Sequence, residues 1–128
     1  MPHLVLHYSA NLKPPLDFVR LFGELHRRLS AVANTSIANF KSRAEKQGDF
    51  LVGDGSPANA FVHLEISLLA RPVAERATIA ETALEVLTSS LAVSLGGLDT
   101  HVTVHVHDLD PEVYRKVVIA KSARPGAA

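Results

Sequence analysis

The chain has 128 residues with 13 basic and 13 acidic side chains, and this zero net charge argues against nucleic acid or an anionic membrane surface as a partner. Hydrophobic residues make up 47% of the chain and charged residues 20%, which excludes an intrinsically disordered protein. Cysteine is absent, which excludes disulfide, thiolate and cysteine–zinc chemistry.

The first predicted elements are a strand and a helix. Side chains alternate between two faces over residues 3–8, as in a strand with one buried face. Pro14 and Pro15 then indicate the start of a helix, because proline is tolerated only in the first turn. Apolar residues at helical spacing form a single stripe between Phe18 and Val32.

A second, more polar strand is predicted over residues 37–45. The glycine-containing stretch 48–57 that follows is typical of a turn region. A small hairpin around residues 50–52 is one arrangement that this region could take.

The same order of elements then repeats. Residues 60–68 alternate strictly between apolar and other side chains, which predicts a strand. Pro72 marks the start of a second helix, whose apolar residues continue to Leu95, and the glycines at 96–97 supply a left-handed stop. A final alternating strand is predicted over residues 100–107.

These elements predict an α+β fold, a two-layer α/β sandwich made of a tandem βαβ repeat. The halves cover about residues 2–47 and 60–110 of a single domain, 1–120, with a flexible tail at 121–128. Each crossover helix makes its two strands parallel, so the halves join into one four-stranded mixed sheet with both helices on one face.

The chain is also expected to be cytoplasmic. No apolar run reaches the ~18 residues needed to span a membrane. The first residues lack the basic region and the cleavage site of a signal peptide.

The sheet face opposite the helices is predicted to be buried in an oligomer. It combines apolar residues with several histidines and one carboxylate, so it is too large to leave open and too polar for an ordinary core. Burial between identical subunits would resolve this conflict. The face comprises His3, Val5, His7, Phe61, His63, Glu65, His101, His105 and His107.

Pro2 has two interpretations. It can simply follow the initiator methionine, without any function. Alternatively, Met1 is removed, as commonly happens before a small residue, and Pro2 then carries a free secondary amine at the head of a buried strand. Burial would favour the neutral form of that amine, and a neutral, fixed amine is a competent general base.

Several segments resemble one known family. The matching segments are the Met-Pro-His start, Ser9, Asn11, Ser42-Arg43, the Ala-Phe-Val-His stretch at 60–63, and Arg71. In this order they resemble the 5-carboxymethyl-2-hydroxymuconate Δ-isomerases of the tautomerase superfamily. The resemblance implies a homotrimer with sheets inside and helices outside. It also implies that Pro2, freed by loss of Met1, is the catalytic base that shuttles a proton between substrate carbons.

The basic residues that the resemblance assigns to substrate carboxylates are carried over one by one. The first arginine of the family falls at Lys41, which keeps the charge but loses the bidentate fork that matches a carboxylate. Arg43 lies two residues on, on the same side of the strand, and could substitute. The second arginine corresponds to Arg71, at a helix entry where backbone N–H groups add affinity for anions. Each of these residues could instead be a solvated surface charge.

The histidines allow a metal interpretation, because three neutral imidazoles gathered at a trimer axis could hold zinc. They could instead fill a polar, hydrated trimer interior, and we predict this arrangement without a metal. Gly53 and Gly55 are explained as turn residues rather than as a phosphate-binding loop, so no cofactor is predicted.

We therefore predict a cofactor-independent isomerase whose partners are a small carboxylate substrate and other copies of the chain. Pro2 would move the proton, and Lys41, Arg43 and Arg71 would hold the carboxylates. Two alternatives stay open. The same proline could support hydration or dehalogenation of an unsaturated acid. The chain could also be a trimeric ligand-binding or structural protein without chemistry. Lys41 favours this alternative, as does His7, because the resemblance implies an acidic residue at that position.

Overall fold

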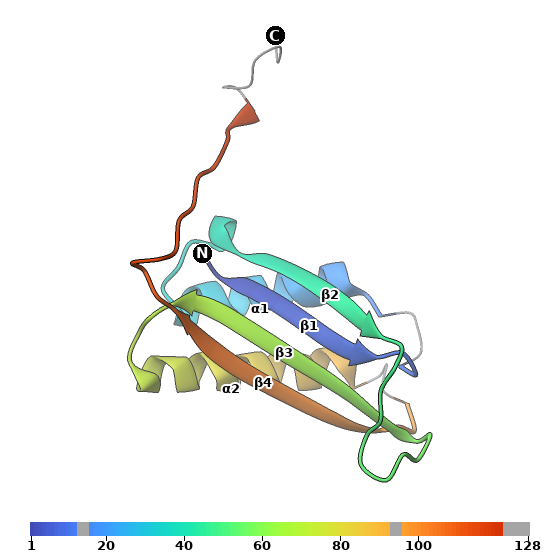
Figure 1. The fold of residues 1–128 in the computed structure, drawn as a ribbon. Helices are drawn as coiled ribbons and strands as arrows, with labels where there is room; N and C mark the ends of the chain where they lie inside the picture. Colours follow the sequence, from blue (N-terminus) through green and yellow to red (C-terminus); the bar gives the residue numbers. More distant parts are fainter. Residues whose placement is uncertain (13–15, 93–95, 122–128) are drawn as a thin grey trace.

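The computed structural model describes residues 1–12, 16–92 and 96–121. Within these ranges the chain forms one four-stranded sheet with the strand order β2-β1-β3-β4 (Figure 1). The strands are β1 (His3–Ser9), β2 (Lys41–Gln47), β3 (Asn59–Leu69) and β4 (Asp99–Leu109).

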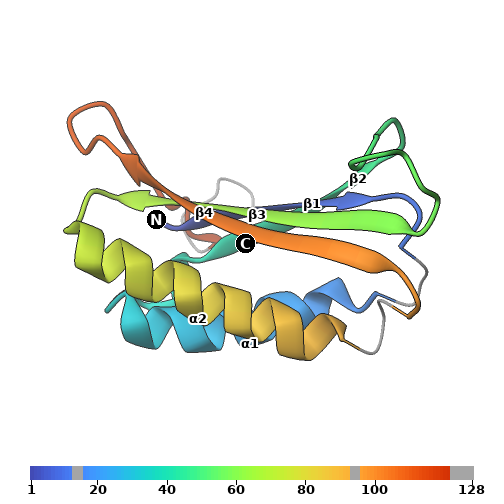
Figure 2. The same ribbon diagram turned by 90° about the horizontal axis from the view of Figure 1, so that it is seen from below.

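The strand directions follow from two helical crossovers. β1 runs parallel to β2, β3 runs parallel to β4, and β1 and β3 are antiparallel. Helices α1 (Phe18–Val32) and α2 (Val73–Leu91) each connect a parallel pair, and both cover the same face of the sheet (Figure 2). This arrangement confirms the predicted α+β fold with a tandem βαβ repeat, a mixed sheet and two layers.

The core lies between the sheet and the helices. Even-numbered side chains of residues 3–7 in β1 and of β3, such as Leu6 and Leu64, are buried there, whereas the odd-numbered ones between them remain partly exposed. This alternation confirms the predicted faces of these strands. The largest core side chains are Leu4, Leu6, Leu25, Leu29, Leu64, Ile66, Leu68, Ile79 and Leu87.

Helix α1 begins later than the two prolines suggest. Pro14 and Pro15 lie outside the described residues, and Phe18 is the first helical residue. Asp17 caps the helix, because its side chain accepts a hydrogen bond of 3.0 Å from the backbone N–H of Arg20.

Helix α2 begins directly after Pro72, as predicted. Leu95 lies outside the described residues, as do residues 122–128 of the predicted tail. The described helix ends at Leu91, and Gly96, with a left-handed φ of 55°, lies beyond residues 93–95, which are outside the described part of the chain. Neither helix within the described ranges has the length and apolar character needed to cross a membrane.

Two predictions between the helices are wrong. Residues 37–39 form a 3₁₀ turn rather than the start of a strand, because the Ser36 side chain accepts a hydrogen bond from the backbone of Ala38. Residues 50–52 form no hairpin strand. The Asn59 side chain instead donates to the Val52 carbonyl at 3.1 Å and holds this segment as a loop.

Candidate functional site

The candidate site lies where β1 begins. Pro2 is fully buried there, and its carbonyl accepts a hydrogen bond of 3.1 Å from the backbone N–H of Lys41, which extends the parallel pairing of β1 and β2. The Met1 amine donates to the carbonyl of Asn39 at 3.0 Å. The start of the chain is therefore fixed between the sheet and the 3₁₀ turn.

Two lysines converge on the same asparagine. The Lys41 Nζ donates to the Asn39 carbonyl at 2.6 Å, and the Lys116 Nζ donates to the Asn39 Oδ1 at 2.9 Å. We call the Met1 amine, Lys41 and Lys116 the amino cluster. Its three members come from three separate parts of the chain.

The amino cluster lowers the basicity of the chain's first amine. The pKa of the Met1 amine falls from 8.0 to about 6, mainly because burial disfavours its charged form and further because Lys41 and Lys116 are positive. Burial is also the main cause that lowers the pKa of His3, followed by the charge of Lys41. The Met1 amine is therefore largely neutral at pH 7.

Arg43 lies two residues after Lys41 in β2. It pairs in register with Val5, is exposed, and lies on the open face of the sheet. Ser42 between them points toward the helices, where its hydroxyl bonds to the His26 Nε2 at 2.6 Å. The structure thus brings Lys41, rather than Arg43, to the Asn39 carbonyl that the first amine uses.

Arg71 is held by backbone carbonyls. Its Nη1 donates to the Ala33 carbonyl at 2.7 Å, and its Nε donates to the Leu69 carbonyl at 3.2 Å. Ala33 is the residue that ends helix α1, so Arg71 ties the end of β3 to the end of that helix. Within the described part of the chain, no protein acceptor bonds to its Nη2.

The segment after β4 is the part of the site that sequence reasoning missed. It passes beside the start of the chain (Figure 1), and the Tyr114 hydroxyl and the His3 Nε2 are hydrogen-bonded at 2.9 Å. The same segment carries Lys116 to Asn39. It has neither helical nor strand periodicity, so the sequence contained no signal that could have placed it there.

The open sheet face carries a polar network centred on Glu65. His7 Nε2 lies 3.4 Å from its carboxylate, and the Nε2 atoms of His63 and His107 lie 3.8 and 3.9 Å from it. The other ring nitrogen of His7 lies 3.4 Å from Glu45. Among the described residues, no group of three or more His, Cys, Asp or Glu side chains has the arrangement of a metal site.

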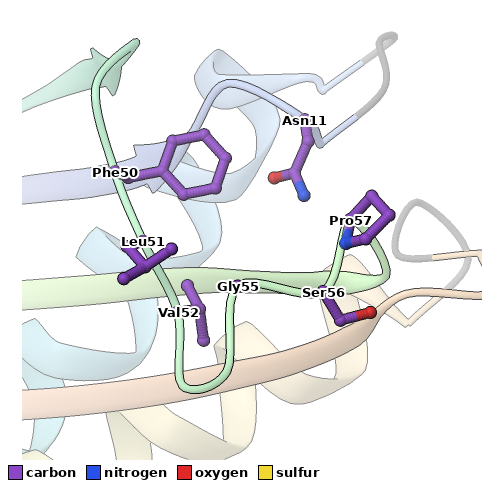
Figure 3. A pocket seen from close by; sticks show the side chains of 7 residues that line it. All are labelled: Asn11, Phe50, Leu51, Val52, Gly55, Ser56 and Pro57. Atoms are coloured by element: carbon purple, nitrogen blue, oxygen red, sulfur yellow. The ribbon is translucent and has the colours of Figure 1, made fainter.

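A cavity of about 250 Å³ lies at the other end of β1 (Figure 3). The Asn11 side chain borders it and donates to the Asn59 carbonyl at 2.7 Å. Ser9 is fully buried and bonds to the backbone of Phe61 through both its hydroxyl hydrogen and its oxygen. Ser9 and Asn11 therefore fix the end of β1 to β3, and neither approaches Pro2. The cavity is lined by Asn11, Phe50, Leu51, Val52, Gly55, Ser56 and Pro57.

Comparison with known families gives one assignment for almost the whole chain. The family described as 5-carboxymethyl-2-hydroxymuconate isomerase matches residues 2–121. No curated sequence matches the chain significantly.

Solved structures share the fold. A 5-carboxymethyl-2-hydroxymuconate isomerase from Deinococcus radiodurans R1 is 24% identical, with a TM-score of 0.80 over 91% of this chain and 88% of that chain. A 5-carboxymethyl-2-hydroxymuconate delta-isomerase is 22% identical, with a TM-score of 0.79 over 94% and 89% of the two chains. A fused 4-OT symmetric trimer is 17% identical, with a TM-score of 0.66 over 84% and 85%.

Proposed function

Because the chain belongs to the 5-carboxymethyl-2-hydroxymuconate isomerase family, we propose that it is a cofactor-independent isomerase of an unsaturated 2-hydroxy or 2-oxo di- or tricarboxylate. The observation that carries this proposal is the position of Pro2, which is fully buried at the start of β1, where Lys41 and Lys116 converge on Asn39. Burial and these two lysines lower the pKa of the neighbouring Met1 amine to about 6, and the same surroundings would favour the neutral form of a Pro2 amine. Such an amine can accept a proton at neutral pH and return it.

The proton carrier is the amine of Pro2 after removal of Met1. Its neutral nitrogen takes a proton from the substrate and leaves a conjugated dienolate. The resulting ammonium then delivers the proton to a different carbon of that dienolate. The amine returns to its neutral form, so the reaction consumes no cofactor. Holding both groups in position supplies a large share of the acceleration, because the proton travels only between fixed partners.

Cationic side chains hold the negative charge of the substrate. Lys41 lies beside the amine, and it binds a carboxylate as a point charge rather than through a bidentate fork. Arg43 offers a second cation on the same side of β2. Arg71 can contribute the Nη2 that no described residue occupies, while its other nitrogens stay on the carbonyls of Leu69 and Ala33.

A homotrimer completes this proposal. The open sheet face carries partly buried apolar and histidine side chains on the side away from both helices, and a single chain leaves this face uncovered (Figure 2). The fused 4-OT protein of the same fold is described as a symmetric trimer. Association through the sheets would bury the Glu65 network between subunits.

The test combines mass analysis with an isomerase assay. Purified protein should lack Met1, and it should convert 2-hydroxymuconate-type dienols to their oxo isomers. Pro2→Ala should lower kcat/KM by about 100-fold, within the usual contribution of a general base. Pro57→Ala is the matched control, because this proline lies at the loop cavity, and it should keep wild-type activity. No turnover by Met1-free protein, or full activity of Pro2→Ala, would contradict the proposal.

A second candidate is a trimeric binding protein that has lost the chemistry. Two observations favour it: Lys41 is tied to the Asn39 carbonyl, and Arg71 is tied to two backbone carbonyls. Retained Met1 in the mass spectrum, together with carboxylate binding and no turnover, would support this candidate. Product identification separates isomerisation from hydration or dehalogenation by the same proline.

A further inference from the structure

Several cations lie around the start of β1. Within the described residues, no carboxylate forms an ion pair with Lys41, Arg43 or Lys116. Other charged pairs do form, since Arg27 bonds to Glu24 and Arg76 lies 3.4 Å from Asp108. The unpaired positive charge is therefore concentrated at one end of the sheet.

Concentrating like charges costs free energy unless an anion compensates them. Lys41 and Lys116 are nevertheless held close together, because both donate to the same residue, Asn39. Both positive charges also lower the pKa of the Met1 amine, after the larger effect of burial. A bound anion would relieve their mutual repulsion.

Lys116 is held in place from two sides. The hydrogen bond between Tyr114 and His3 anchors the segment after β4 to β1, and the bond to the Asn39 Oδ1 orients the ammonium. An ammonium has three donors, so the bond to Asn39 leaves two for a ligand. Lys116 thus offers fixed positive charge beside the amine but from a different part of the chain than Lys41.

We propose that Lys116 binds a second carboxylate of the substrate and thereby makes the site selective for dicarboxylates over monocarboxylates. This inference rests on the proposed function, because it uses the same site. Lys41 and Lys116 occupy two different atoms of Asn39, the carbonyl oxygen and the Oδ1. This separation suits a ligand with two carboxylates, each of which meets one ammonium.

Binding of unreactive acids tests the inference without any turnover. The probes are muconate, which has two carboxylates, and sorbate, which has the same diene and only one. Calorimetry on the wild-type protein should find muconate bound at least tenfold more tightly than sorbate. Lys116→Gln should remove most of this preference by weakening muconate binding, with little change for sorbate. Lys116→Arg should keep it, because the charge is retained.

Lys46 supplies the matched control. It lies near the other end of β2, away from Asn39, and Lys46→Gln should leave the preference unchanged. Circular dichroism and sedimentation of each variant exclude loss of fold or assembly as the cause. The inference would be overturned if Lys116→Gln kept the preference for muconate. It would also be overturned if this variant bound muconate and sorbate more weakly by the same factor. If Pro2→Ala keeps full activity while Lys116→Gln loses the preference, the proposed mechanism fails and the inference about Lys116 stands.

Discussion

The two βαβ halves begin in the same way and differ in charge. In the first half, the Pro2 carbonyl accepts a hydrogen bond from the backbone of Lys41 at 3.1 Å. In the second half, the Ala58 carbonyl accepts one from the backbone of Asp99 at 2.8 Å. Pro2 and Ala58 therefore occupy equivalent positions before β1 and β3, and a lysine in one half corresponds to an aspartate in the other.

This difference explains why only one half can carry the proposed chemistry. The nitrogen of Ala58 is an internal amide, which has no basicity, and Asp99 would stabilise positive charge beside it. The first half instead has an amine near the chain start, and Lys41 destabilises its protonated form. Since β1 and β3 are antiparallel, the two positions lie at opposite ends of the sheet.

Reversing the charge at Lys41 tests this comparison most strongly. In Lys41→Asp a negative group replaces a positive one, so the pKa of the amine should rise by about 1 unit or more. The lower limb of the pH profile of kcat/KM should move to higher pH by the same amount. Activity at pH 7 should fall roughly 10- to 100-fold, because the amine is protonated and the substrate carboxylate is repelled.

The reverse change in the second half is the control. Asp99→Lys introduces the same charge difference at the equivalent position, far from the amine, and should leave the pH profile unchanged. A profile of Lys41→Asp that coincides with the wild-type profile would show that Lys41 does not act on the base.

The two layers of the fold could be predicted from the sequence. Burial of one face makes apolar residues recur at every second position in β1 and β3 and at about every fourth position in α1. Side chains such as Leu6 and Leu25 are where this periodicity predicts. The ends of the helices and strands were predicted less accurately, because they depend on single hydrogen bonds. The Ser36 side chain accepts a hydrogen bond that stabilises the 3₁₀ turn before β2. Such a bond leaves no trace in the hydrophobic periodicity from which strand boundaries are predicted.

The site could be predicted only in part. The resemblance indicated Pro2 and Lys41, and the structure brings their backbones into contact. The position of Lys116 could not be predicted, because its approach to Asn39 depends on the course of an irregular segment after β4. Ser9 and Asn11 supported the resemblance, yet they lie at the other end of β1 and bond to β3.

Arg71 connects the two halves, and its replacement should affect stability. Arg71→Met removes charged hydrogen bonds to the carbonyls of Leu69 and Ala33 and should lower the free energy of unfolding by about 1–2 kcal/mol. Denaturant titration measures this loss. Arg28→Met is the control, because Arg28 makes a long surface contact of 3.4 Å with Glu85, and this variant should cost less than about 0.5 kcal/mol. Equal midpoints for the two variants would contradict this role of Arg71.

The smallest expected effect concerns His26, which lies between α1 and β2 in the first half. Burial lowers the pKa of its imidazole below the model-peptide value of 6.5, and its ring contacts Ser42 and Phe40. The folded state therefore prefers the neutral ring, whereas the unfolded chain binds a proton more readily. The stability from this difference is fully present above pH 6.5 and decreases as the pH falls through the range between the two pKa values.

The free energy of unfolding should consequently decrease between pH 7 and pH 5, and His26→Gln should flatten this slope. Denaturant midpoints measured at several pH values give the comparison. His3 and the Met1 amine contribute in the same direction, because burial and Lys41 lower the pKa of both, so part of the slope should persist in His26→Gln and decrease further when His3→Gln is added. Replacing the exposed His101 by glutamine in the second half controls for loss of a histidine as such. A slope in the double variant that equals the wild-type slope would show that neither His26 nor His3 causes the acid sensitivity.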